Sequence, residues 1–202
     1  MKNKTRIMAV SDLHGDSGLA RKLAKQAKDE KVDLVILAGD LTFFDTKPKN
    51  IIGPFAKEGK EVLIIPGNHE TVATTDLLAE TYSNTKSIHG YAITKGDIGI
   101  FGAGGGDCII TTRDKEIYAL LKKGNEKIKN SKKKIMVTHM HPQNSKAEFS
   151  GFEGSKAVRK AIEAFQPDIL ISGHIHEAGG LQEKIGKTKV IHVARKATIF
   201  EI

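Results

Sequence analysis

The 202-residue sequence has one cysteine, no tryptophan and no long apolar run. Because Cys108 is alone, no disulfide can form within the chain, and the sequence favours a reducing compartment. A membrane-spanning helix needs about 20 consecutive apolar residues, and no segment approaches that length. Only the apolar residues 7–10 follow the charged N-terminus, too few for the core of a secretory signal peptide. We therefore expect a cytoplasmic protein without membrane contact.

Proline and aromatic residues are also scarce, with 5 prolines and 5% aromatic side chains, whereas hydrophobic residues make up 39% of the chain. This composition excludes disordered, collagen-like and coiled-coil proteins. Single domains typically contain about 100–200 residues, so residues 1–202 are expected to form one domain. The formal net charge of +8 admits nucleic acid as a partner but does not establish it.

Short apolar segments alternate along the chain with segments of helical periodicity. Strands are expected at 7–10, 34–38, 62–65, 87–88, 91–94, 98–101, 135–138 and 169–172. Helices are expected at 19–30, 51–58, 75–82, 114–130 and around 158–165. This alternation predicts an α/β fold with parallel strands, in which two mixed sheets pack together between helices. The last segments, 181–185, 189–193 and 197–201, are expected to form an antiparallel meander.

Five of the predicted strands are followed by side chains that commonly bind metals. The segments read Asp12-Leu13-His14, Gly39-Asp40, Gly67-Asn68-His69-Glu70, Thr138-His139 and Gly173-His174-Ile175-His176. Ligands of open α/β sheets bind at the carboxyl ends of the strands. Carboxylate, amide and imidazole groups suit divalent Mn, Fe, Zn, Co or Ni. Each segment alone also fits a turn or a helix cap, but five in succession favour a metal site.

The ordered set resembles the calcineurin-like metallophosphoesterase superfamily, and the resemblance extends from residue 12 to residue 176. It implies a four-layer α/β/β/α sandwich and two divalent metal ions, with Mn expected and Fe, Zn, Ni or Co as alternatives. By this resemblance, one metal is held by Asp12, His14, Asp40 and His176. The other is held by Asp40, Asn68, His139 and His174. His69 matches the family's catalytic histidine.

The resemblance implies hydrolysis of a phosphodiester, or of a small phosphomonoester, by a hydroxide that bridges the two metals. His69 would stabilise or protonate the departing oxygen. The protein Ser/Thr phosphatase branch carries an aspartate that pairs with this histidine, but Phe43 occupies that position here. A protein phosphatase is therefore disfavoured, and Asp45 and Glu70 are the candidates to orient His69. The short chain leaves no room for a large cap domain.

Two residues outside this set are further candidates for contact with a phosphate-ester substrate. His141 follows His139 by two residues and is also an alternative metal ligand. For Arg113 the alternative is an ordinary surface arginine. The glycine-rich segment 102–106 matches neither a dinucleotide-binding nor a P-loop fingerprint, so we expect a loop near the mouth of the site.

Two other functions stay open. The positive charge points to a nuclease or another enzyme that processes nucleic acid, for which binding would weaken steeply with salt. A non-catalytic scaffold of the same fold is the second alternative, although His69 and every metal position are present. The sequence also admits a homo-oligomer.

Overall fold

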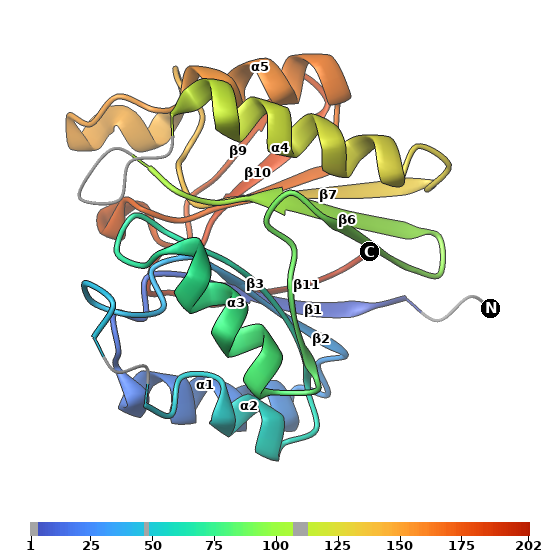
Figure 1. The fold of residues 1–202 in the computed structure, drawn as a ribbon. Helices are drawn as coiled ribbons and strands as arrows, with labels where there is room; N and C mark the ends of the chain where they lie inside the picture. Colours follow the sequence, from blue (N-terminus) through green and yellow to red (C-terminus); the bar gives the residue numbers. More distant parts are fainter. Residues whose placement is uncertain (1–3, 47–48, 107–112) are drawn as a thin grey trace.

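The computed structural model describes residues 4–46, 49–106 and 113–202, which form two β-sheets between layers of helices (Figure 1). The first sheet contains, in spatial order, β11 (Thr198–Glu201), β1 (Arg6–Val10), β2 (Leu34–Ala38), β3 (Glu61–Ile65) and β4 (Thr85–Ser87). The second contains β5 (Ala92–Lys95), β6 (Ile98–Ala103), β7 (Lys133–Thr138), β8 (Ile169–Ser172), β10 (Thr188–His192) and β9 (Gln182–Ile185). Both sheets have parallel central strands and an antiparallel strand on at least one edge.

The helices cover the outer faces of the sheets. The first sheet packs against α1 (Ser17–Asp29), α2 (Gly53–Lys57) and α3 (Val72–Thr81), and the second against α4 (Asp114–Lys127) and α5 (Lys156–Phe165). Two 3-10 helices, η1 (Lys146–Ser150) and η2 (His176–Ala178), lie in loops. Figure 1 shows the resulting four layers, which confirm the predicted α/β fold.

Local sequence explains where these helices begin and which face they bury. In α5, the Ser155 side chain accepts a hydrogen bond from the Val158 N–H at the first turn. Val158, Ala161 and Ile162 lie on one helical face and are buried against the second sheet. The helix ends at Gln166, whose φ of 47° is left-handed, and the following proline cannot continue it.

The core between the two sheets explains the continuous apolar runs of the central strands. Along β1, Ile7 and Ala9 pack between the sheets, whereas Met8 and Val10 pack beneath the helices. All four residues are fully buried. Strands covered on both faces need apolar residues at every position, which is why these runs do not alternate with polar residues.

The last strand contradicts the predicted antiparallel meander. The hairpin between β9 and β10 forms, but β10 then pairs in parallel with β8, and β11 crosses to the first sheet and pairs antiparallel with β1. There, Ile199 packs against the apolar side chains between the first sheet and its helices. Phe200 packs against the apolar side chains between the two sheets. Apolar partners on both faces of the first sheet thus favour this position over the end of a meander.

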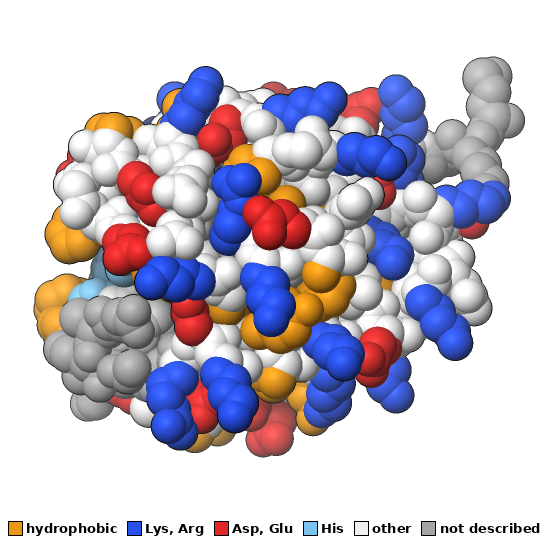
Figure 2. All heavy atoms as spheres, turned by 90° about the horizontal axis from the view of Figure 1, so that it is seen from above, with side chains coloured by type: hydrophobic (Ala, Val, Ile, Leu, Met, Phe, Trp, Pro, Cys, Tyr) orange, Lys and Arg blue, Asp and Glu red, His pale blue; other side chains and the backbone are white. Residues whose placement is uncertain are grey.

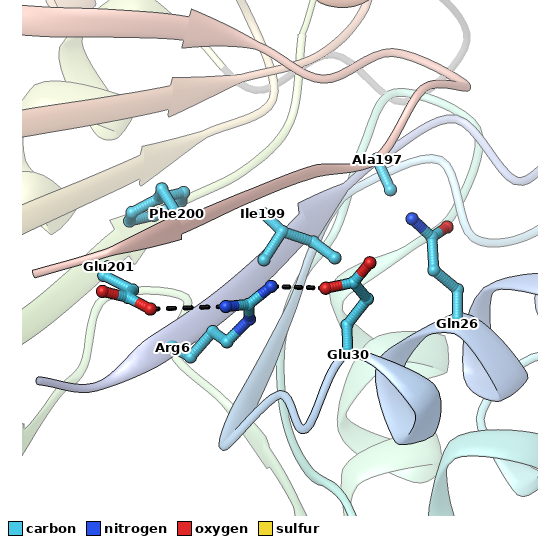
Figure 3. Close-up of a pocket in the computed structure, with 7 residues that line it drawn as sticks. All are labelled: Arg6, Gln26, Glu30, Ala197, Ile199, Phe200 and Glu201. Carbon is cyan, nitrogen blue, oxygen red and sulfur yellow. Dashed lines mark hydrogen bonds and ion pairs between the residues drawn. The ribbon is translucent and has the colours of Figure 1, made fainter.

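An arginine joins β11 to the rest of the first sheet. Arg6 of β1 pairs with Glu201 of β11 at 3.3 Å and with Glu30, which follows α1 (Figure 3). The pairs lie beside a surface cavity, so solvent screens them and each contributes little to stability. The part of the chain that the structure describes has no helix long and apolar enough to cross a membrane.

Candidate metal centre

The loops after five parallel strands meet at one edge of the two sheets. Strands β1, β2 and β3 belong to the first sheet, and β7 and β8 belong to the second. The structure brings together all the residues that the resemblance implied as metal ligands. These are Asp12, His14, Asp40, Asn68, His139, His174 and His176.

One group of ligand atoms consists of Asp12, His14 and His176. The two Nε2 atoms of His14 and His176 lie 3.1 Å apart, and Asp12 Oδ1 lies 3.4 Å from His176 Nε2. The other carboxylate oxygen of Asp12 accepts hydrogen bonds from the Ser11 hydroxyl and from the His174 N–H. These bonds fix the carboxylate so that Oδ1 faces the imidazoles.

A second group consists of Asn68, His139 and His174. Asn68 Oδ1 lies 2.8 Å from His139 Nε2 and 3.1 Å from His174 Nδ1. His139 Nδ1 lies 3.0 Å from the backbone oxygen of Ala38, which can only accept a hydrogen bond. His139 therefore carries its hydrogen on Nδ1 when it is neutral, and its Nε2 lone pair points into the site.

Asp40 lies between the two groups. Its Oδ2 atom is 3.6 Å from His14 Nε2 in the first group and 3.4 Å from His139 Nε2 in the second. Its Oδ1 atom accepts a hydrogen bond from the His69 N–H at 3.0 Å. One carboxylate oxygen of Asp40 thus faces both groups of ligand atoms.

Buried side-chain atoms that have no hydrogen-bond partner are consistent with a cation site here. Among the described residues, Asp12 Oδ1 has no hydrogen-bond partner although it is buried, and the same holds for His14 Nδ1. A buried charged oxygen without a partner is costly. Oxygen and imidazole nitrogen atoms from carboxylate, amide and histidine side chains suit divalent transition metals. The donor set and its unpaired oxygen therefore fit metal ions.

The backbone around the site is in unusual conformations. Asp12, His14, Asp40 and His174 have φ values of 58°, 45°, 52° and 73°, in the left-handed region that non-glycine residues rarely adopt. Such conformations concentrate at functional sites, where the surrounding structure must hold them. The backbone at Gly67 also lies so close to Asp40 that a side chain at Gly67 would collide with it.

The charged groups of the site strongly shift one another's pKa values. Burial raises the pKa of Asp40, but the charge of His139 and its neighbours outweighs this and holds that pKa well below its usual range. In turn, burial lowers the pKa of His139, but the larger combined influence of Asp40 and nearby groups raises it to about 10. Burial lowers the pKa of His174 to about 4. A metal that binds His139 must therefore displace a proton.

His69 lies beside the ligand groups, with its Nε2 atom 3.9 Å from Asp40 Oδ2. Its ring stacks on Phe43 at a centroid distance of 5.3 Å and an angle of 22°, and it also contacts Phe44 at 4.5 Å. Neither predicted orienting residue contacts the imidazole. Asp45 Oδ1 instead accepts a hydrogen bond from the Thr71 N–H.

Glu70 also differs from its predicted role, because its side chain points into the protein. It is fully buried and accepts hydrogen bonds from three backbone N–H groups, those of Gly67, Leu41 and Thr42. Burial and the neighbouring charge of Asp40 raise its pKa to about 7. Glu70 thus joins the loop after β2 to the loop after β3.

A cavity of about 530 Å³ opens over the two ligand groups. Five of the seven ligand residues named above line it, together with His69. The remaining lining residues are Phe43, Phe152, Ile175, Glu177 and Arg195. The cavity size is typical of a site for one small molecule.

Comparison with known proteins shows to which family the chain belongs. A sequence model described as calcineurin-like phosphoesterase matches residues 5–178, which include all five motif segments. The chain belongs to the calcineurin-like phosphoesterase family. The predicted resemblance is therefore confirmed. No protein with a curated description matches this chain in sequence.

Solved structures share the fold of this calcineurin-like phosphoesterase at low sequence identity. The protein TT1561 of Thermus thermophilus has a TM-score of 0.79 and 17% identity over 98% of this chain and 99% of its own. A novel archaeal phosphodiesterase has a TM-score of 0.57 and 15% identity, with 98% and 100% covered. A dimetal phosphatase from Danio rerio has a TM-score of 0.57 and 11% identity, with 93% and 86% covered. These likenesses support the fold.

The two predicted substrate contacts do not line the cavity of this phosphoesterase. His141 is buried, and its ring stacks on that of His174 at a centroid distance of 6.0 Å. Its Nε2 atom lies 3.2 Å from the backbone oxygen of Phe152. Arg113 precedes α4, is 81% exposed, and pairs with Glu116. Contact of His141 or Arg113 with a substrate therefore stays a prediction.

Sequence reasoning missed Arg195, Glu177 and Phe152 as lining residues of the phosphoesterase cavity. Arg195 follows β10, and its backbone N–H donates a hydrogen bond to the Ser11 oxygen at 3.0 Å. Glu177 directly follows the candidate ligand His176, which is the one signal that could have indicated it. Arg195 and Phe152 belong to no motif.

The glycine-rich segment 102–106 is only partly a loop, because Gly102 and Ala103 belong to β6; the residues after them lie beside the candidate ligand Asn68. The Gly105 N–H donates a hydrogen bond to the Pro66 backbone oxygen at 3.1 Å. A Cβ atom added at Gly106 would lie 3.3 Å from Asn68 Cβ. Cys108 lies outside the described residues.

Proposed function

We propose that this calcineurin-like phosphoesterase hydrolyses phosphodiesters with two divalent cations, of which Mn²⁺ is the expected one. The single observation that carries the proposal is the position of Asp40 Oδ2, which faces His14 in one ligand group and His139 in the other. A shared carboxylate oxygen is the arrangement expected of a two-metal site. The fold is also that of proteins described as a phosphodiesterase and a dimetal phosphatase.

The assignment of ligands follows the two groups. Asp12, His14, Asp40 and His176 would hold one ion, and Asp40, Asn68, His139 and His174 would hold the other. Bound metal ions polarise phosphoryl oxygens and lower the pKa of water, so that a nucleophile is available near neutral pH. The backbone hydrogen bonds to Asp12, Asp40 and His139 keep these ligands in place before a cation arrives.

Two other residues have proposed roles toward the substrate. His69 lines the cavity and donates a proton to the departing ester oxygen, while its stacking on Phe43 sets the ring orientation. Arg195 is the only lysine or arginine among the described residues that line the cavity, and its guanidinium binds a phosphate oxygen. Because a phosphodiester carries one negative charge, a single arginine suits it.

The test begins with elemental analysis of the purified protein and complete removal of metal by a chelator. We expect the metal-free protein to be inert toward methyl p-nitrophenyl phosphate, a diester, and Mn²⁺ to restore turnover. Turnover of p-nitrophenyl phosphate, a monoester, measures the preference between the two classes. A protein that hydrolyses neither ester with any divalent metal would overturn the proposed function and favour a scaffold.

Two variants separate metal binding from proton transfer. His69→Ala is expected to lower kcat by about 10²–10⁴-fold with the metal content unchanged, because it removes only the proton donor. Asn68→Ala is expected to lower the amount of metal that the protein binds. If His69→Ala lost metal and activity together, the assigned role of His69 as proton donor would be wrong.

A further inference from the structure

Two exposed phenyl rings line the cavity over the metal ligands. Phe43 follows β2 of the first sheet and is 48% exposed, and Phe152 follows η1 and is 65% exposed. Histidine side chains reach the surface at the left edge of Figure 2, with hydrophobic side chains beside them. Exposed apolar side chains next to a polar site are typical of a surface that binds a ligand.

Ring stacking holds Phe43 in place, and hydrogen bonds hold the backbone of Phe152, despite the exposure of both side chains. Phe43 stacks on His69 with nearly parallel planes. The backbone oxygen of Phe152 faces His141 Nε2 at 3.2 Å, and its N–H donates to the Ser150 hydroxyl. His141 in turn stacks on the ligand His174. A backbone that is fixed in advance reduces the conformational freedom that is lost when a ligand binds.

Charged groups at the cavity complement the rings. Arg195 offers a guanidinium, and its Nη1 atom is held 3.4 Å from the backbone oxygen of Asp12. Glu177 in η2 offers a carboxylate that can accept hydrogen bonds from sugar hydroxyl groups. Guanidinium groups bind phosphate, and phenyl rings stack on nucleobases. Together these groups match the three parts of a nucleotide.

We infer, on the basis of the proposed function, that the substrate is a small phosphodiester of a nucleoside whose base stacks on Phe43 and Phe152. The cavity of about 530 Å³ has the size of a site for one small ligand. A groove for a nucleic-acid strand carries a series of cationic side chains, whereas Arg195 alone lines this cavity among the described residues. A mononucleotide ester therefore fits better than a strand.

The experiment compares two inhibitors that differ only in the base. Turnover of methyl p-nitrophenyl phosphate by the Mn²⁺-loaded protein is inhibited with adenosine 5′-monophosphate or with ribose 5-phosphate. We expect the inhibition constant of the adenosine compound to be about tenfold lower, because stacking of one base on aromatic side chains contributes on that scale. Inhibition constants are read independently of kcat, so a slower variant does not bias the ratio.

Three variants assign the effect to the rings. Phe152→Ala and Phe43→Leu are expected to reduce the ratio between the two inhibition constants toward one. Phe149→Ala is the matched control, because Phe149 is also 65% exposed, lies three residues from Phe152, and does not line the cavity. This control should keep the ratio of the parent protein.

The outcomes distinguish this inference from the proposed function. Turnover of the methyl ester with equal inhibition by both compounds overturns the nucleoside preference and leaves the phosphodiesterase activity intact. A ratio that survives both ring variants, or that Phe149→Ala also abolishes, overturns the role of Phe43 and Phe152. Absence of turnover with every metal overturns the proposed function, and the inference fails with it. Tighter binding of a single-stranded oligonucleotide than of adenosine 5′-monophosphate overturns the choice of a small substrate.

Discussion

Replacing Glu70 tests how the loops after β2 and β3 are held together. Glu70 Oε1 accepts hydrogen bonds from the N–H groups of Gly67 at 2.8 Å and Leu41 at 3.2 Å, and Oε2 accepts one from Thr42 at 3.3 Å. All four residues are buried, so water cannot replace a lost acceptor. The side chain therefore satisfies three backbone groups at once.

The expected magnitude follows from counting these groups. Each unsatisfied buried donor costs about 1–3 kcal/mol, so loss of the acceptor for three donors in Glu70→Ala should lower the free energy of unfolding by roughly 3–9 kcal/mol. Glu70→Gln keeps one oxygen as the acceptor for Gly67 and Leu41 but turns an amide NH₂ toward the Thr42 N–H. Its cost should be about 1–3 kcal/mol, because one of the three donors loses its acceptor. Domains have total stabilities of about 5–15 kcal/mol, so the alanine variant approaches the limit of folding.

The measurement is urea unfolding of the metal-free protein, followed by titration with Mn²⁺. Both variants should also bind Mn²⁺ more weakly than the parent, because Asp40 and Asn68 lie in the loops that Glu70 joins. Glu126→Ala, at an exposed position of α4, is the control and should leave both quantities unchanged. The reasoning is refuted if Glu70→Ala unfolds within about 0.5 kcal/mol of the parent, the ordinary scale of a neutral surface change. Equal destabilisation by the alanine and glutamine variants would refute it as well.

Four further predictions concern the backbone at Gly67, the pH dependence of Mn²⁺ affinity and of stability, and the binding of the substrate phosphate. Gly67→Ala places a side chain against Asp40 and should abolish Mn²⁺ binding, and a variant with parental Mn²⁺ affinity in a calorimetric titration would contradict the observed packing. The pKa of His139 is raised to about 10, so Mn²⁺ affinity should rise with pH up to that value, by about tenfold per pH unit for each proton displaced; a flat profile in titrations between about pH 6 and 9 would exclude proton displacement. The same raised pKa stabilises the metal-free fold below about pH 6.5, and this contribution should be lost in unfolding titrations as the pH rises through about 10. Arg195→Ala should raise KM for the diester by about tenfold whereas Arg113→Ala leaves it unchanged, and equal effects would show that Arg195 does not bind the phosphate.

Much of the fold could be predicted because its central strands are covered on both faces. Their uninterrupted apolar runs, such as β2, separate them from helices with one apolar face, such as α5. The course of β11 could not be predicted in the same way. Its residues suit an edge position in either sheet, and the choice depends on the partners that Ile199 and Phe200 find in three dimensions.

The candidate metal ligands could be predicted to lie near one another because parallel strands end at one edge of a sheet. What each side chain contacts within the site depends on packing that no motif records. Phe43, not the predicted Asp45 or Glu70, stacks on His69, and Glu70 turns inward because the buried N–H groups around it need an acceptor. Arg195 lines the cavity from the chain after β10, where its backbone N–H donates a hydrogen bond to the Ser11 oxygen.

The ligand groups draw their members from both sheets. Asp12, His14, Asp40 and Asn68 follow strands of the first sheet, whereas His139, His174 and His176 follow strands of the second. Any ion coordinated by both sets would cross-link the two halves of the molecule and favour the native over the denatured ensemble by mass action. Starvation for that ion would then produce chains that are more easily degraded as well as inactive, so cellular abundance would track metal supply.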